Sequence, residues 1–474
     1  MTGRSQNTQL KRRSFLRALL AAAGGAIGVG TWLFWKNSLG RPRRRPNIIF
    51  ILADDLGYGD LGSYGQERIQ TPNLDAMAAQ GMRFTDCYAG SAICAPSRCC
   101  LMTGLHTGHA RIRRTRTVDD LTVPLRPEDV TVAEVLKEAG YVTACIGKWG
   151  LGDAGTTGVP NKQGFDEWFG YLSQDHAHNY YPTYLWRNEE KVSINQNEDG
   201  ENGIYSHDLF TEEALDFIRA NRRNPFFLYL AYTIPHAPLR VPDDQPYSDE
   251  TWPKAERNFA SMITRMDSDI GRIASALQEL GIDENTIVFF SSDNGPHGQD
   301  GHWEHFFDSA GPLRGRKSNY YEGGIRVPMI VWWPGIVEPG RVSDQVWAFW
   351  DFLPTAAELA GAELPTHIDI DGISMLPTFL GEEQPEHDFL YWEHFREGQA
   401  RFDQAVRMGD WKGIWRGPDE GFELYNLRED SGEAQDIADR HPEIVAQIAD
   451  LMQTARTPSD EFSTNPVPWP GPGK

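Results

Sequence analysis

The sequence has few cysteines, and their placement excludes two common kinds of stabilised fold. Its 474 residues contain five cysteines without regular spacing, and four of them fall within fourteen positions: Cys87, Cys94, Cys99 and Cys100, with Cys145 further on. A disulfide framework requires cysteines spread over the chain, and a structural zinc site requires paired ligands at fixed intervals. Neither pattern is present, and the chain has no internal repeat.

Basic residues are also scarce beyond the N-terminus. The net charge is −22, yet residues 1–45 hold ten Lys and Arg and no acidic residue, so subtracting these ten charges leaves −32 for the remainder. Such a charge excludes nucleic acid as a partner, because binding to phosphates depends on clustered cations. It also opposes the long-range attraction of an anionic substrate, whose capture would then depend on a local cationic pocket.

The N-terminus has the pattern of an export signal. The adjacent arginines Arg12 and Arg13 precede an apolar stretch rich in alanine and glycine at residues 18–35. This pattern is typical of a Tat-like signal, which exports folded proteins, and the stretch is about long enough to remain as an N-terminal anchor. We therefore expect a protein that is periplasmic or anchored to the outer face of the inner membrane, with no other membrane contact.

Four apolar runs predict buried parallel strands, because they are unbroken and rich in β-branched or aromatic residues. They are Asn47–Ala53, Tyr141–Gly147, Phe226–Ile234 and Thr286–Ser291. Each run is followed directly by polar residues: Asp54 and Asp55, Lys148, His236, or Asp293 and Asn294. The carboxyl ends of such strands line the ligand crevice of an open α/β sheet, so we expect these side chains to meet.

Amphipathic stretches between these runs predict helices, and the alternation gives an α/β fold. The predicted helices are Asn73–Gln80, Val130–Ala139, His207–Ala220 and Ala255–Leu280, and a fifth strand is predicted at Val327–Trp333. After about residue 385, short aromatic-rich runs predict a small antiparallel sheet, which a helix at Pro442–Arg456 follows. The chain from Thr457 onward is rich in proline and predicts an irregular tail.

The segment around Cys94 carries the most specific motif. Cys94-Ala-Pro96-Ser97-Arg98 is followed by Leu101-Met-Thr-Gly104, and further motifs lie in a fixed order along the chain. They are Ala53-Asp-Asp-Leu-Gly-Tyr-Gly-Asp60, Thr71-Pro-Asn-Leu-Asp75, Gly147-Lys-Trp-Gly-Leu-Gly152, Pro235-His-Ala-Pro238, Ser292-Asp-Asn-Gly295 and Leu313-Arg-Gly-Arg-Lys317. Together they resemble the formylglycine-dependent sulfatases, the type I sulfatases or arylsulfatases of the alkaline phosphatase superfamily, from Pro46 to about Arg456.

This resemblance implies a fold and a division of the chain. The expected fold is alkaline phosphatase-like, with a large, mostly parallel mixed sheet sandwiched by helices and a smaller C-terminal antiparallel α+β subdomain. The expected parts are the signal or anchor at 1–45, a catalytic sulfatase domain at 46–385, a C-terminal subdomain at 386–456 and the Pro-rich tail at 457–474.

The residue types at two strand ends predict a metal site. Asp54, Asp55, Asp293 and Asn294 offer only oxygen ligands, which favours a hard cation such as calcium. The resemblance implies one calcium ion, with the modified Cys94 completing its coordination.

The resemblance also implies the catalytic roles. A maturation enzyme would oxidise Cys94 to formylglycine, whose hydrate has one hydroxyl to attack sulfur and a second that allows sulfate to be expelled. Arg98 would hold this hydrate, Lys148 and Lys317 would bind sulfate oxygens, and His236 would protonate the leaving alcohol. A helix is expected to begin at about Ser97. The dipole at the N-terminus of this helix would favour an anion at Cys94.

One position departs from the pattern of the resembled family. That pattern often has histidine two residues after the lysine of Lys148, in contact with the nucleophile, and this chain has Gly150. The segment from Gln174 to His178 is the nearest source of a replacement, and we choose His178.

Variable loops are expected to form the substrate pocket. Candidates for contact with a sugar are Asp175, His176, His178, His302 and Asp308, with Trp149 and Trp303 as aromatic faces. The predicted activity is hydrolysis of a sulfate ester on a sulfated sugar or polysaccharide fragment. Two alternatives stay open: a phosphonate monoester or phosphodiester hydrolase, and a non-catalytic protein that binds sulfated glycans.

Overall fold

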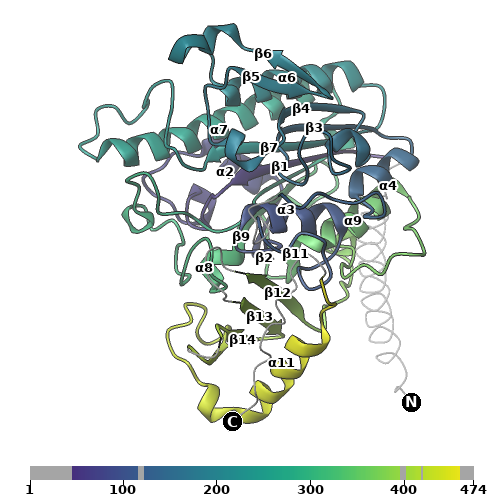
Figure 1. Cartoon of the computed structure of the whole chain (residues 1–474), viewed down its shortest axis with the longest axis vertical. Helices are drawn as coiled ribbons and strands as arrows, with labels where there is room; N and C mark the ends of the chain where they lie inside the picture. The colour runs from purple at the N-terminus through teal and green to yellow at the C-terminus, as the bar shows by residue number, and fades with distance from the viewer. Residues whose placement is uncertain (1–44, 116–121, 396–401, 418–419, 460–474) are drawn as a thin grey trace, which may run out of the picture. The chain divides into compact units, whose positions relative to one another are not determined.

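The computed structural model describes residues 45–115, 122–395, 402–417 and 420–459 (Figure 1). The predicted export signal or anchor lies outside the described residues except for Arg45, and only residues 457–459 of the predicted Pro-rich tail are described. Within these ranges no helix combines the length and the apolar character needed to cross a membrane.

A mixed sheet of eleven strands carries the larger part of the fold. Its order is β10-β2-β9-β8-β1-β7-β3-β4-β5-β6, and β11 pairs with β2. The bounds are β1 Asn47–Asp54, β2 Met82–Tyr88, β3 Val142–Lys148, β4 Glu167–Tyr171, β5 Tyr184–Arg187, β6 Glu190–Ser193, β7 Phe226–Pro235, β8 Thr286–Ser292, β9 Arg326–Trp332, β10 Arg341–Ser343 and β11 Trp347–Ala348. The four neighbours β8, β1, β7 and β3 are parallel, whereas β9 runs antiparallel to both β8 and β2.

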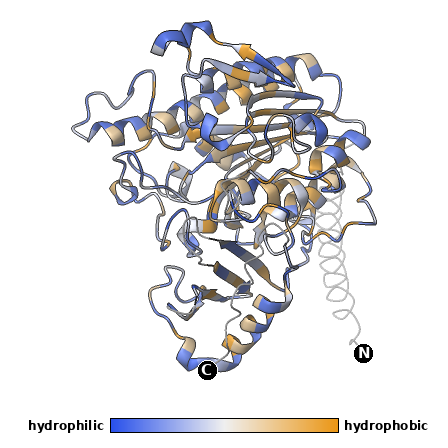
Figure 2. Cartoon of the chain, viewed as in Figure 1, coloured by the Kyte–Doolittle hydropathy of each residue, from blue (hydrophilic) through white to orange (hydrophobic). Residues whose placement is uncertain are grey.

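The central strands are apolar on both sides because both faces of the sheet are covered. Along β1, Ile48, Phe50 and Leu52 belong to one buried cluster, and Ile49, Ile51 and Ala53 belong to the other. Figure 2 shows these strands as the hydrophobic interior between more polar helices. Side chains of a strand alternate between faces, so an unbroken apolar run is what a doubly covered strand requires.

Helices divide between the two faces. Those of the first cluster are α3 Cys94–Thr103, α4 Val132–Glu138 and α9 Phe352–Ala360. Those of the second are α2 Pro72–Gln80, α6 Ser206–Asn221 and α7 Lys254–Glu279. The remaining helices are α5 Gln174–Ala177, α8 Glu322–Ile325, α10 Leu376–Leu380 and α11 Pro442–Thr454. The sheet is therefore sandwiched by helices, as Figure 1 shows.

A second sheet of four antiparallel strands follows near the C-terminus. Its strands are β12 Leu390–Phe395, β13 Phe402–Met408, β14 Trp411–Trp415 and β15 Phe422–Asn426, in that order. One face packs against α11 through Val445, Ile448 and Met452, and Trp392 on the other face joins the first cluster of the large sheet. This small sheet thus lies between α11 and the body of the fold.

The predicted fold class is confirmed, and the differences are local. Strand β2, which lies between the edge strand β10 and β9, was not predicted, because Arg83, Thr85 and Asp86 interrupt its apolar residues. The helix expected from Ser97 begins at Cys94 instead, since the fixed φ of Pro96 suits a first helical turn. The predicted domain boundary at 385/386 stays a prediction.

Candidate active site

The carboxyl ends of four adjacent parallel strands carry the predicted site residues. Asp54 is the last residue of β1 and Lys148 the last of β3, while His236 follows β7 directly and Asp293 follows β8. Because β3, β7, β1 and β8 are neighbours in that order, their ends present these side chains to one crevice.

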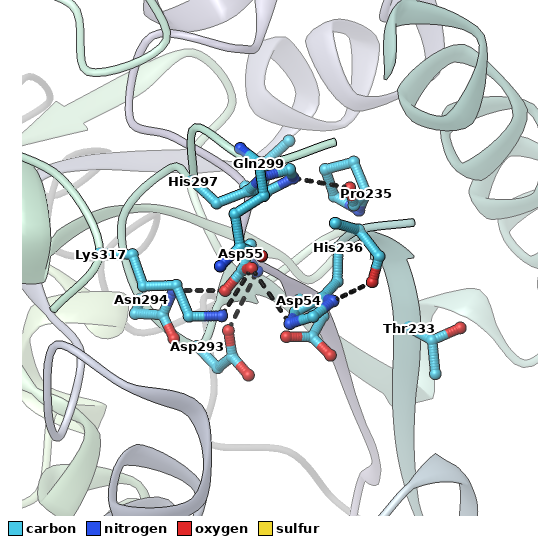
Figure 3. Close-up of polar contacts among 12 residues, drawn as sticks. Asp54, Asp55, Thr233, Pro235, His236, Asp293, Asn294, His297, Gln299 and Lys317 are labelled. Carbon is cyan, nitrogen blue, oxygen red and sulfur yellow. Dashed lines mark hydrogen bonds and ion pairs between the residues drawn. The ribbon is translucent and has the colours of Figure 1, made fainter. Parts of the chain in front are cut away.

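Asp55 occupies the centre of the polar cluster in Figure 3. Its Oδ2 lies 2.7 Å from Lys317 Nζ and 3.4 Å from His236 Nε2, and its Oδ1 accepts a hydrogen bond of 2.7 Å from Asn294 Nδ2. The backbone N–H of Asp55 donates to Asp293 Oδ1. Asp55 has a φ of +67°, a left-handed conformation that aspartate tolerates better than most residues. This turn aims its carboxylate back into the crevice.

A second set of buried charges surrounds Asp54. Its Oδ2 lies 2.6 Å from Lys148 Nζ and 3.6 Å from an Arg98 guanidinium nitrogen. Arg98 also binds Asp293 Oδ2, with its Nε at 2.9 Å, and donates to the carbonyl oxygen of Lys148 at 2.7 Å. All four side chains are at most 1% exposed. Arg98 therefore ties the ends of β1, β3 and β8 together.

Cys94 lies at the N-terminus of α3, beside these charges. Its sulfur is within 4.8 Å of oxygen atoms of Asp54 and Asp293. Burial raises the pKa of the Cys94 thiol, although Lys148 and Lys317 oppose this effect, so the unmodified side chain is a neutral thiol at neutral pH. An unactivated thiol is a poor metal ligand and a poor nucleophile. The unmodified Cys94 thiol is therefore not activated by its surroundings.

The oxygen atoms of the cluster fit a hard cation. Asp54 Oδ1 and Asn294 Oδ1 are buried without a hydrogen-bond partner, an arrangement that costs free energy unless a ligand satisfies them. Three carboxylates and one amide then supply oxygen ligands and no nitrogen or thiolate, the donor set that calcium and magnesium prefer. The predicted ligands Asp54, Asp55, Asp293 and Asn294 thus meet in one place.

The pKa values of the three carboxyl groups differ with their partners. Burial alone would raise the pKa of Asp54, but Lys148, His236 and Arg98 lower it to about 2. Lys317 and His236 likewise overcome burial and hold the pKa of Asp55 well below its usual range. Burial and the adjacent Asp54 raise the pKa of Asp293 to about 7 despite Arg98. Asp54 and Asp55 are therefore charged and ready to coordinate a cation at neutral pH.

The ring of His236 has one nitrogen available for proton transfer. Nδ1 lies 2.5 Å from the carbonyl oxygen of Ala237 and must donate to it, which leaves Nε2 facing Asp55. Burial lowers the pKa of His236 to about 3, although Asp55 opposes this shift. The free ring is neutral, and Nε2 is the atom that takes up or releases a proton.

The residues predicted to contact a sugar differ in their exposure and in what they pack against. His178 is exposed and stacks on His236, with ring centroids 4.5 Å apart and planes at 12°. Asp175 and Asp308 are exposed, whereas His176 packs between Tyr171 and Tyr184. His302 is enclosed by Phe259 and Glu256, and Trp149 is buried with its indole N–H on the carbonyl of Gly158, so neither position favours the predicted substrate contact. Trp303 is 64% exposed.

Two buried residues near the site were missed. His297 donates a hydrogen bond from Nε2 to the carbonyl oxygen of Pro235, and its ring lies 6.1 Å from that of His236 (Figure 3). Its place three residues after Asn294 was the available signal. The second residue, Gln174, was considered only as part of a histidine-containing segment.

Comparison with known proteins agrees with this arrangement. The sulfatase family model matches residues 46–362, and the model described as N-sulphoglucosamine sulphohydrolase, C-terminal, matches residues 316–457. The N-acetylgalactosamine-6-sulfatase of Canis lupus familiaris is 33% identical over 443 residues, covering 88% of this chain and 81% of that protein. The N-acetylgalactosamine-6-O-sulfatase of Bacteroides thetaiotaomicron is 30% identical, covering 88% and 94%.

Solved structures give the same assignment. Ps i-CgsB in complex with k-i-k-neocarrahexaose has a TM-score of 0.77 and 32% sequence identity, covering 86% of this chain and 92% of that chain. The phosphonate monoester hydrolase of Agrobacterium radiobacter, with a TM-score of 0.63 and 20% identity over 86% of this chain and 95% of its own, shares the fold alone. With a family model over most of its length and relatives at this identity, the chain belongs to the sulfatase family and is a sulfatase enzyme.

Proposed function

We propose that this sulfatase releases sulfate from a sulfated sugar or polysaccharide fragment, using a formylglycine derived from Cys94 and one calcium ion. The observation that carries the proposal is the meeting of Cys94 with four oxygen ligands and three buried or half-buried cations at the strand ends. Relatives named for sulfated N-acetylgalactosamine, and one solved with neocarrahexaose, support a saccharide substrate. A maturation enzyme would have to oxidise Cys94.

Different side chains of the site would carry out different parts of this reaction. A hydrated aldehyde at position 94 supplies a nucleophilic hydroxyl and a second hydroxyl that permits release of sulfate. Arg98, fixed by Asp293 and the carbonyl of Lys148, orients this group. Lys148 and Lys317 now pair with Asp54 and Asp55. Asp54 and Asp55 would hold the cation, and Lys148 and Lys317 would then bind sulfate oxygens through Nζ as charge builds on them.

His236 completes the reaction by delivering a proton to the leaving oxygen, and because the free ring is neutral with its hydrogen on Nδ1, Nε2 first takes up this proton from solvent. We expect His236→Ala to lower kcat on a sulfated sugar by about 10²- to 10⁴-fold, the usual contribution of general acid catalysis. The loss on 4-nitrophenyl sulfate will be much smaller, because nitrophenolate leaves without a proton. Steady-state kinetics on both substrates measures the ratio. Equal losses on the two substrates would exclude the acid role, and His305→Ala, at an exposed histidine, serves as the control.

Substrate class is tested by comparing 4-nitrophenyl sulfate with bis(4-nitrophenyl) phosphate, followed by sulfated oligosaccharides. The proposal expects sulfate release from the aryl sulfate and from at least one sulfated saccharide. Preferential hydrolysis of the phosphodiester would instead support the phosphonate monoester or phosphodiester alternative. Saturable binding of sulfated glycans without any turnover would support the non-catalytic alternative.

The calcium proposal predicts a change in stability. Calcium at about 100 times its dissociation constant should stabilise the chelator-treated protein by about 2.7 kcal/mol, because it binds the folded state alone. Thermal unfolding with and without calcium measures this shift, and Asp55→Asn combined with Asp293→Asn should remove it. A shift of equal size in that double variant would place the calcium elsewhere.

We propose in addition that the chain is exported by its Tat-like signal to the periplasm, or remains anchored to the outer face of the inner membrane. Support comes from the twin arginine and apolar stretch of the N-terminal segment. Fractionation of the native host, with N-terminal sequencing of the product, distinguishes a cleaved periplasmic form from an anchored one. A cytoplasmic full-length product would contradict export.

A further inference from the structure

The carboxamide of Gln174 is buried against Gly150, two residues after the end of β3, without any hydrogen-bond partner. The side chain is 8% exposed, and both Nε2 and Oε1 are buried and form no hydrogen bond. A buried amide normally has several partners, and leaving one unsatisfied costs about 1–3 kcal/mol. A bound group with both a donor and an acceptor would offset this cost.

The backbone holds this amide against the end of β3. Gly150, two residues after Lys148, has a φ of +82°, and a Cβ placed there would lie 2.0 Å from Gln174 Nε2. Hydrogen bonds from Trp149 N to Tyr171 O and from Gly150 N to Leu172 O fix the two segments side by side. A residue other than glycine at position 150 is thus excluded by both its conformation and the amide.

The rest of the Gln174 segment also faces the site. Helix α5 begins at Gln174, where the Ser173 side chain caps it, and it ends at Ala177; the next residue, His178, stacks on His236. The segment therefore borders the crevice from the Lys148 side to the His236 side. At this edge of the crevice, Lys148 provides a positively charged ammonium group and Gln174 provides a neutral N–H donor.

We propose that Gln174 binds the sulfate ester directly, with Nε2 donating to a sulfate oxygen and Oε1 accepting from an adjacent hydroxyl. This inference rests on the proposed function for its substrate class. A carboxamide suits the task because it offers a donor and an acceptor without adding charge to an edge that already holds Lys148.

The test measures binding of inorganic sulfate, by inhibition of aryl sulfate hydrolysis and by sulfate-dependent thermal shift. In Gln174→Met, an apolar side chain of similar length, we expect sulfate affinity to fall about 10-fold or more, as for a lost hydrogen bond to a charged group. Thermal stability without sulfate should stay equal or rise, because the variant removes a buried amide that has no partner. Gln174→Glu should weaken sulfate binding further by repulsion.

A matched control separates this role from a structural one. Gln163 is also buried and its Oε1 also lacks a partner, but its Nε2 donates to the carbonyl oxygens of Arg126 and Thr157. Gln163→Met should therefore lose stability and keep its sulfate affinity. Unchanged sulfate affinity in Gln174→Met, or a loss of stability like that of the control, would overturn the inference. The thermal shift does not need turnover, so an inactive wild-type protein that binds sulfate through Gln174 would contradict the proposed function alone.

Discussion

Cys94→Ser will lose steady turnover of 4-nitrophenyl sulfate by at least about 10⁴-fold while still releasing nitrophenolate once per active site. Removing a covalent nucleophile typically costs this much or more. A serine hydroxyl at the N-terminus of α3 can attack sulfur, transfer its proton and expel nitrophenolate. The resulting serine sulfate has no second hydroxyl on its β-carbon, so its C–O bond does not break. A stopped-flow burst followed by a flat baseline, and a stable mass increase of one sulfuryl group, measure this outcome.

The control for this variant is Cys87→Ala in the same tryptic peptide, Phe84–Arg98. Cys87 lies buried on β2 and is not part of the cluster of Asp54, Cys94 and Asp293, so turnover should persist. Mass spectrometry of the wild-type peptide from the native host should show formylglycine or its hydrate at Cys94. An unmodified Cys94 in fully active protein, or undiminished steady turnover in the serine variant, would refute the formylglycine proposal.

Lys412→Met will destabilise the fold by about 3–5 kcal/mol, the usual cost of removing one partner of a buried ion pair. Lys412 Nζ on β14 lies 2.7 Å from Glu322 Oε1 and 2.9 Å from Glu433 Oε1, and all three side chains are fully buried. Burial and the nearby Glu322 already raise the pKa of Glu433 to about 7, although Lys412 opposes this. Without the ammonium group, two carboxyl groups remain without their main cation. Urea denaturation followed by tryptophan fluorescence measures the loss.

The size of this loss should depend on pH. A carboxyl group whose pKa is raised in the folded state stabilises that state below the unfolded pKa of about 4.3, and this contribution disappears as pH rises through the folded pKa. The variant should therefore be closest to wild type near pH 5 and furthest from it near pH 8. Lys137→Met, which removes a half-exposed pair with Asp166, is the control and should cost less than about 1 kcal/mol. A similar small loss for Lys412→Met would contradict the structural importance of the triad.

Much of the site was predictable because its residues follow strands that can be recognised as unbroken apolar runs in the sequence. The apolar runs before Asp54, Lys148, His236 and Asp293 are covered on both faces, so hydrophobicity alone marks them, and the carboxyl ends of adjacent parallel strands must meet. Ion pairs whose partners are brought together by the course of a loop could not be predicted from hydrophobic patterns. The approach of Lys317 to Asp55 spans 262 positions and is fixed by a turn, which no periodic pattern encodes.

Other features depended on packing between segments. Strand β2, which lies between β10 and β9, was not predicted because polar residues alternate with its apolar ones. His302 looked accessible in a polar loop, but its ring is held by Glu256 of α7, a partner 46 positions away. Gln174 carried no motif at all, and its significance appears only where Gly150 leaves room for its amide.

The triad of Glu322, Lys412 and Glu433 also bears on how this chain can be recombined. Glu322 lies five residues after Lys317, on the same short connection that reaches the crevice, and its carboxylate is anchored by a lysine of the small sheet. A chain cut after α10, or a chimaera that borrows the small sheet from a relative without a matching cation, would leave Glu322 Oε1 without its lysine, while Oε2 would keep Tyr88 and Arg326. The segment that carries Lys317 would then lose a buried contact with the small sheet. The two sheets are therefore best exchanged together.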